Sequence, residues 1–108
     1  MPPAPLVEGN PQEASLDVDV VHEPTRRRFV ARAGQKESHL FYIPGAHGVV
    51  EFRTTYVDPA LRGQGVGEKL VLAALGWARD EGIKVIPTCW YVGTVVRRHP
   101  EFEALLIP

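Results

Sequence analysis

A glycine-rich segment, Arg62-Gly63-Gln64-Gly65-Val66-Gly67, separates two stretches of this chain whose apolar residues follow different periods. Before it, the run Val49 to Val57 has the length and β-branched composition of a strand. After it, apolar residues from Val66 to Trp77 recur at i, i+4 and i+7, which predicts an amphipathic helix that ends at Gly82. The sequence therefore predicts a strand, a glycine-rich turn and a helix in direct succession.

This junction has the properties of an anion site. The N–H groups of Gly65, Val66 and Gly67 precede the first intrahelical hydrogen bond, so they are expected to point at a bound phosphate. Glycine permits close backbone approach and positive φ, and Arg62 can add a charged contact. We interpret the segment as a pyrophosphate site made of Arg62, Gly63, Gln64, Gly65, Val66 and Gly67. The alternative is a strand-to-helix turn that binds nothing.

Other phosphate motifs match this segment less well. A dinucleotide fold requires G-x-G-x-x-G and an acidic residue about 20 positions later, whereas the glycines here are spaced G-x-G-x-G. A P-loop ends in Gly-Lys-Ser/Thr, but Gly67 is followed by Glu68-Lys69-Leu70. A nucleotide-binding module is therefore disfavoured.

Composition limits the remaining classes. The chain has 108 residues and a formal net charge of −1, which predicts one domain and gives no reason to expect nucleic acid or an anionic membrane as partner. Its apolar runs are shorter than the roughly 20 residues of a membrane span. The single cysteine favours a reducing, cytoplasmic location. Residues 1–15 are proline-rich and predicted to be a disordered tail, followed by a domain over 16–108.

The rest of the pattern predicts an α+β fold: an antiparallel meander joined by a right-handed β-α-β crossover to a small mixed sheet with two helices. Both tryptophans, Trp77 and Trp90, are expected to pack, and Thr54 and Tyr56 are expected on the same face as Phe52. The expected strands are Leu16–Val21, Arg28–Arg32, His39–Ile43, Val49–Val57 and Ile83–Ile86, and the last helix is Tyr91–His99.

The pattern Arg62-x-x-Gly65-x-Gly67 resembles the acyl-CoA pyrophosphate loop of the GNAT N-acetyltransferase superfamily. Over Asp17 to Leu106 the chain is similar to a compact, single-domain GNAT-like family that also carries a P-x-C motif. The residues that carry this likeness are Arg28-Phe29, Tyr42, Thr54-Thr55-Tyr56-Val57, Leu61-Arg62-Gly63-Gln64-Gly65, Pro87-Thr88-Cys89-Trp90-Tyr91-Val92 and Arg98-His99-Pro100-Glu101-Phe102.

The resemblance implies that acetyl-CoA is the co-substrate. No pair of histidines has metal-ligand spacing with further His, Cys or acidic ligands, so no metal is predicted. The resemblance also implies that the strand ending at Tyr56-Val57 diverges from Ile83–Ile86 and that free backbone groups of Tyr56 and Val57 hold the pantetheine arm. The thioester would then end near Thr54, Thr55 and Cys89. Larger GNATs cover the acceptor with two helices, where this chain has only the short segment Gly34 to Ser38. The acceptor side is therefore expected to be open, which favours a protein lysine or N-terminus.

Acetyl transfer to an amine can proceed directly in a ternary complex or through an acetyl-thioester on a cysteine. The family's P-x-C position suggests Cys89 as the catalytic nucleophile; otherwise Cys89 is a small buried apolar residue. The family's usual histidine before the turn is replaced by Thr54, and threonine cannot accept a proton near neutral pH. The sequence thus predicts a GNAT-type acetyltransferase, with a non-catalytic CoA-binding or protein-interaction module as the alternative.

Overall fold

The computed structural model describes residues 18–107, which form one five-stranded sheet and two α-helices. The predicted tail over 1–15 lies outside the described residues. The sheet order is β1-β2-β3-β4-β5, antiparallel up to β4, with β5 parallel to β4. The strands are β1 (Asp19–Glu23), β2 (Arg28–Ala33), β3 (Lys36–Pro44), β4 (Val49–Tyr56) and β5 (Lys84–Ile86), and the helices are α2 (Val66–Glu81) and α3 (Trp90–Arg98).

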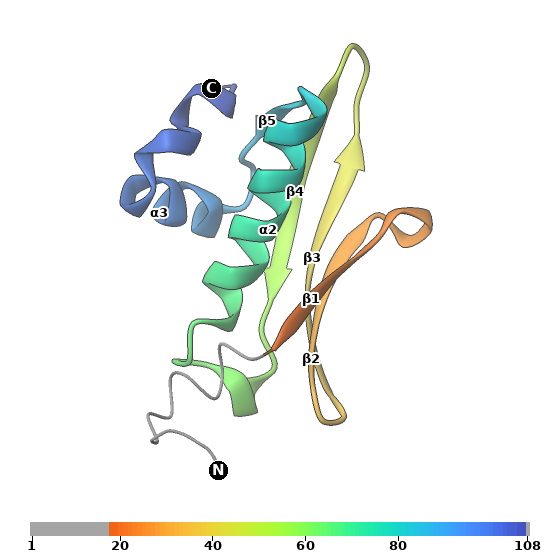
Figure 1. Cartoon of the computed structure of the whole chain (residues 1–108), viewed down its shortest axis with the longest axis vertical. Coiled ribbons are helices and arrows are strands. Elements are labelled where there is room, and N and C mark those ends of the chain that lie inside the picture. Colours follow the sequence, from red (N-terminus) through yellow and green to blue (C-terminus); the bar gives the residue numbers. More distant parts are fainter. Residues whose placement is uncertain (1–17, 108) are drawn as a thin grey trace.

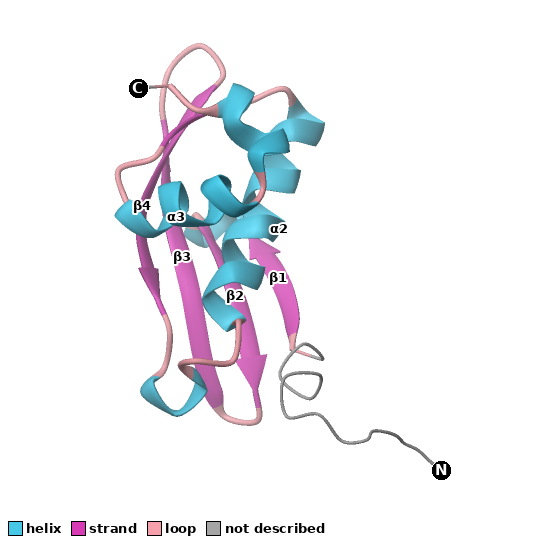
Figure 2. Ribbon diagram, turned by 90° about the vertical axis from the view of Figure 1, so that its left-hand side faces the viewer, coloured by secondary structure: helices cyan, strands magenta, loops and turns pink. Residues whose placement is uncertain are grey.

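Both helices lie on the same face of the sheet (Figures 1 and 2). The apolar stripe of α2 supplies the centre of the core, because Leu70, Val71, Ala74, Leu75 and Ala78 are all fully buried. Gly82 ends this helix with φ 70°, and Ile83 N donates back to Ala78 O at 2.8 Å, so the chain turns directly into β5. The predicted α+β architecture, with its meander and its parallel crossover, is confirmed.

The short connections also agree with the prediction. β2 and β3 are joined by the two-residue turn Gly34-Gln35, with Ala33 paired to Lys36. After α3, the chain forms a 3-10 segment at Pro100–Leu105 that buries Phe102, and Ile107 N then donates to Val85 O at 2.8 Å on the free edge of β5. The predicted breaks between strands are less accurate, because β1 continues through His22 and Glu23 and β3 begins three residues before His39.

A β-bulge in β4 changes which side chains lie on each face of that strand, compared with the prediction. Phe41 pairs with Thr54 and Tyr42 pairs with Phe52, so Arg53 is an extra residue without a partner on β3. One extra residue reverses the in–out alternation of everything that follows it. As a result Thr54 and Tyr56 are exposed, and Thr55, opposite the buried Leu40, lies on the helix-covered face. The expectation that Thr54 shares a face with Phe52 is wrong.

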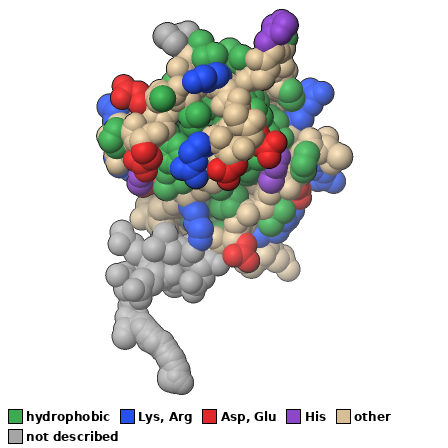
Figure 3. Space-filling model, turned by 45° about the horizontal axis from the view of Figure 1, so that its top comes forward, with side chains coloured by type: hydrophobic (Ala, Val, Ile, Leu, Met, Phe, Trp, Pro, Cys, Tyr) green, Lys and Arg blue, Asp and Glu red, His purple; other side chains and the backbone are tan. Residues whose placement is uncertain are grey.

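Charges of both signs are interspersed among apolar side chains on the face that Figure 3 shows. In the described part of the chain no helix is long and apolar enough to cross a membrane. Nor do residues 18–107 contain a group of three or more His, Cys, Asp or Glu side chains that could hold a metal ion.

A half-buried histidine links the edge of the sheet to α2. The His22 ring stacks on Phe29 with centroids 4.2 Å apart, lies 4.8 Å from Trp77 and hydrogen-bonds the Tyr42 hydroxyl at 2.6 Å. Burial lowers the pKa of His22, and it also lowers the pKa of His39. The folded protein therefore favours the neutral rings, whereas the unfolded chain takes up protons near the ordinary pKa of about 6.5.

We therefore expect stability to be lost as the pH falls below about 6.5, because only the unfolded state gains protons there. Urea unfolding at a series of pH values from about 7.5 to 5.5 measures this loss as a falling midpoint. The loss should be smaller in His22→Gln, whatever the absolute stability of that variant. A midpoint that does not change with pH would contradict the assignment.

Candidate functional site

The two parallel strands separate soon after they begin. β5 pairs with β4 only over Val49–Glu51, while β4 continues to Tyr56. The last backbone link across the gap runs from Cys89 N to Phe52 O at 3.0 Å. Beyond that bond, the edge of β4 that was paired with β5 faces the start of α3, while the opposite edge stays paired with β3. The separation of strands that the family resemblance implies is thus present.

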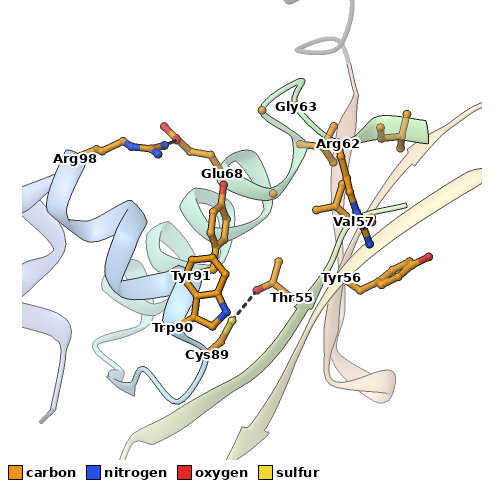
Figure 4. Close-up of a pocket in the computed structure, with 14 residues that line it drawn as sticks. Thr55, Tyr56, Val57, Arg62, Gly63, Glu68, Cys89, Trp90, Tyr91 and Arg98 are labelled. Carbon is orange, nitrogen blue, oxygen red and sulfur yellow. Dashed lines mark hydrogen bonds and ion pairs between the residues drawn. The ribbon is translucent and has the colours of Figure 1, made fainter. Parts of the chain in front are cut away.

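A pocket of about 550 Å³ lies in this gap (Figure 4). It runs from Cys89 to the glycine-rich turn before α2, so the two dense motifs of the sequence line one continuous cavity. Its lining residues are Thr55, Tyr56, Val57, Leu61, Arg62, Gly63, Gly65, Val66, Gly67, Glu68, Cys89, Trp90, Tyr91 and Arg98. Of the site residues predicted from the sequence, Thr54 and Gln64 do not line the pocket; the Gln64 amide nitrogen lies 3.4 Å from Ala60 O.

The turn before α2 is anchored to the sheet by a buried hydroxyl. Ser38 is fully buried and accepts a hydrogen bond from Asp58 N at 3.0 Å. The Asp58 side chain in turn accepts from Ala60 N at 2.9 Å and caps the 3-10 turn Pro59–Leu61. These bonds hold the backbone that leads into the glycine-rich segment.

The three glycines of the segment serve two different needs. Gly63 and Gly65 adopt left-handed backbone conformations with φ 78° and 82°. Gly67 is instead closely packed, since a Cβ there would lie 3.1 Å from Cε2 of Tyr91 and 3.2 Å from Cγ2 of Val57. The first intrahelical bond runs from Lys69 N to Gly65 O, so the N–H groups of Val66, Gly67 and Glu68 precede it. N–H groups in this position at a helix N-terminus can bind an anion.

The conformation of Gly65 leads to a prediction with an internal control. Gly65→Ala is expected to cost about 1–2 kcal/mol of stability, because alanine is strained at positive φ. Gly76→Ala, within the same helix, is expected to gain about 0.5–1 kcal/mol, because an added Cβ there meets nothing closer than Arg79 at 3.9 Å. Chemical denaturation of both variants measures the difference. Equal stability of the two would contradict the role assigned to Gly65.

The Arg62 side chain contacts the end of β4. Its Nε donates to Val57 O at 3.0 Å, so the guanidinium folds back over the end of β4. The Val57 carbonyl, which was expected to be free, is therefore occupied. This contact places the planar cation between the glycine-rich turn and the strand end, on the pocket wall.

Cys89 lies at the other end of the pocket, directly before the first turn of α3. Its side chain is half-buried, and the thiol donates to Thr55 Oγ1 at 3.5 Å. The bulge at Arg53 is what turns Thr55, rather than Thr54, toward the thiol (Figure 4). His47 and His99, the histidines nearest these motifs in sequence, do not line the pocket.

Five pocket residues were not predicted as site residues: Leu61, Glu68, Trp90, Tyr91 and Arg98. Trp90 was expected to pack but is 78% exposed on the pocket rim. Tyr91 stands against Gly67, and burial raises the pKa of its phenol, with Glu68 adding to the effect. Glu68 was expected to face solvent, yet it binds both Arg98 and His99, and hydrogen bonding to His99 is the main cause that lowers the pKa of Glu68. The signal available was the family's C-x-Y pattern, which includes Tyr91.

Comparison with known proteins agrees with this geometry. Residues 28–105 match the family model of the GCN5-related N-acetyltransferases. Mouse Protein NATD1 is 32% identical over 101 residues, covering 92% of this chain and 86% of the mouse protein. Human Protein NATD1 is 31% identical over 90 residues, covering 82% and 80%.

The fold agrees as well. The solution structure of a GCN5-like protein from Staphylococcus aureus aligns with a TM-score of 0.65 at 19% identity, covering 84% of this chain and 89% of that one. This likeness supports the fold, and the family match covers β2 to β5, the glycine-rich turn, Cys89 and α3 together. The chain belongs to the GCN5-related N-acetyltransferase family.

Proposed function

We propose that this protein transfers an acetyl group from acetyl-CoA to an amine by way of a thioester on Cys89. The observation that carries the proposal is the single pocket that joins the glycine-rich turn to the Cys89 thiol. Its volume of about 550 Å³ suits a pantetheine arm with its phosphates extending outward. Family membership supports CoA as the donor.

The chemistry follows from the nature of the thiol. The thiolate form of a cysteine is the nucleophile, and it attacks the acetyl carbonyl. The bond from the acetyl carbon to the CoA sulfur breaks, and CoA leaves as its thiolate. A neutral amine then attacks the Cys89 thioester, regenerates the thiolate and loses its extra proton to solvent. Cys89 begins α3, whose N-terminal N–H groups can stabilise the negative charge that develops on the oxygen.

A protein amine is the acceptor that the architecture favours. The β2–β3 connection is only the turn Gly34-Gln35, so no helix from this part of the chain covers the open face of the sheet. That face carries exposed Phe41, Ile43 and Tyr56, and Tyr56 also lines the pocket. A large acceptor can therefore reach the site without entering a closed cavity.

A second candidate function rests on a specific observation. The group nearest the Cys89 thiol is the Thr55 hydroxyl, which cannot take a proton from an incoming amine. Glu51, on β4, accepts a hydrogen bond from Thr88 and does not line the pocket, and Glu68, which does line it, is bound to Arg98 and His99. A module that binds CoA without transferring acetyl would need no base.

Transfer assays with labelled acetyl-CoA separate the two candidates. The enzyme is expected to release CoA and label a mixture of lysine-containing peptides at a rate that depends on their concentration. A protein that binds acetyl-CoA but labels neither peptides nor small amines would support the non-catalytic module. Labelling of small amines alone would contradict a protein acceptor.

A further inference from the structure

Two cations reach the pocket from opposite walls. Arg62 comes from the turn after β4, and Arg98 comes from the last turn of α3 (Figure 4). They are the only arginines or lysines among the described residues that line the cavity. Arg62 lies at the glycine-rich turn, so it and the N-terminus of α2 can bind one anionic group of a ligand. Arg98 can then bind a second anionic group of the same ligand.

Arg98 is held by a carboxylate that it shares with His99. Its Nη1 binds Glu68 Oε1, while His99 Nε2 binds the other oxygen of the same carboxylate at 2.9 Å. The Arg98 side chain lines the pocket and remains 58% exposed. Because Glu68 also binds His99, its carboxylate would keep a partner if Arg98 turned toward a ligand. The planar guanidinium could then offer N–H groups to a phosphate.

We infer that Arg98 binds the 3′-phosphate of CoA, a phosphate monoester, and thereby makes the protein select CoA over 3′-dephospho-CoA. The inference rests on the proposed CoA site and assigns a second, separate phosphate contact within it. A pyrophosphate and a phosphate monoester on one ligand match two cations on separate walls of one pocket. Arg97, the adjacent arginine, contacts Thr94 instead and does not line the cavity.

The test is calorimetric titration of CoA and of 3′-dephospho-CoA into the full chain. The wild type is expected to bind CoA about 10–100-fold more tightly, which is the usual range for a charge-assisted phosphate contact. Arg98→Gln should reduce that preference to about threefold or less while leaving the affinity for 3′-dephospho-CoA almost unchanged. Arg97→Gln is the matched control and should keep the full preference.

Each outcome has a distinct meaning. If the wild type binds the two ligands equally, or if Arg98→Gln weakens both by the same factor, the assignment of Arg98 is wrong while the CoA site remains. If the wild type binds neither ligand, the proposed function itself fails. Thermal unfolding of Arg98→Gln and Arg98→Lys checks folding, and the lysine variant should retain part of the preference because it retains the charge.

Discussion

Replacing Arg62 by glutamate is expected to weaken acetyl-CoA binding by about 100-fold or more. The change removes a cation from the pocket wall and adds an anion beside the pyrophosphate cradle. Loss of one charge-assisted hydrogen bond accounts for about 1.5–3 kcal/mol, and repulsion adds to it. Since each 1.4 kcal/mol is a factor of ten, wild-type binding near micromolar would become too weak to titrate readily.

Arg26→Glu provides the matched control, because it makes the same charge change on an exposed arginine that does not line the pocket. Its affinity for acetyl-CoA should stay within about threefold of the wild type, as expected for distant charges screened by salt. Equal weakening by both variants would indicate a general charge effect. If Arg62→Glu binds acetyl-CoA as tightly as the wild type does, the phosphates do not bind at the glycine-rich turn.

Replacing Cys89 by alanine is expected to lower acetyl transfer by about 1,000-fold or more, as removal of a covalent nucleophile does elsewhere. Acetyl-CoA affinity should change little, because the phosphate cradle lies at the other end of the pocket. After treatment with acetyl-CoA alone, the intact wild-type protein should gain the mass of one acetyl group, and Cys89→Ala should not.

Thr55→Val distinguishes the nucleophile from its surroundings. It removes the hydroxyl that accepts from the thiol but keeps the shape of the side chain. We expect this variant to form the acetyl-thioester still, with a changed rate. Undiminished transfer by Cys89→Ala would show that the amine attacks acetyl-CoA directly, and a mass gain in Cys89→Ala would place the acetyl group on another residue.

The parts of the fold that could be predicted are those encoded locally. Apolar alternation in the strands, the 3.6-residue stripe of α2 and the stop at Gly82 depend on neighbouring residues, and each is present in the structure. The bulge at Arg53 depends instead on how β4 pairs with β3, and alternation carries no sign of it. That single residue determines which threonine faces Cys89.

Within the site too, features that depend on neighbouring residues could be predicted, and features that depend on tertiary packing could not. The glycine-rich turn is a continuous motif, so its place between β4 and the start of α2 could be predicted from adjacent residues alone. Glu68, Tyr91 and Arg98 enter the pocket because α3 packs beside the start of α2, which is a tertiary arrangement. The packing of Tyr91 against Gly67 explains why that position excludes a side chain, a reason distinct from backbone strain at Gly65.

The most direct test of the CoA site is to titrate acetyl-CoA into isotopically labelled protein and follow the backbone amide resonances. We expect saturable shifts at micromolar ligand concentration, largest at Gly63 to Gly67, at Thr55 to Val57 and at Cys89 to Tyr91, with little change around the β1–β2 connection at Pro24–Arg26. Absence of saturable shifts, or shifts confined to another part of the surface, would contradict the account of this pocket as the acetyl-CoA site.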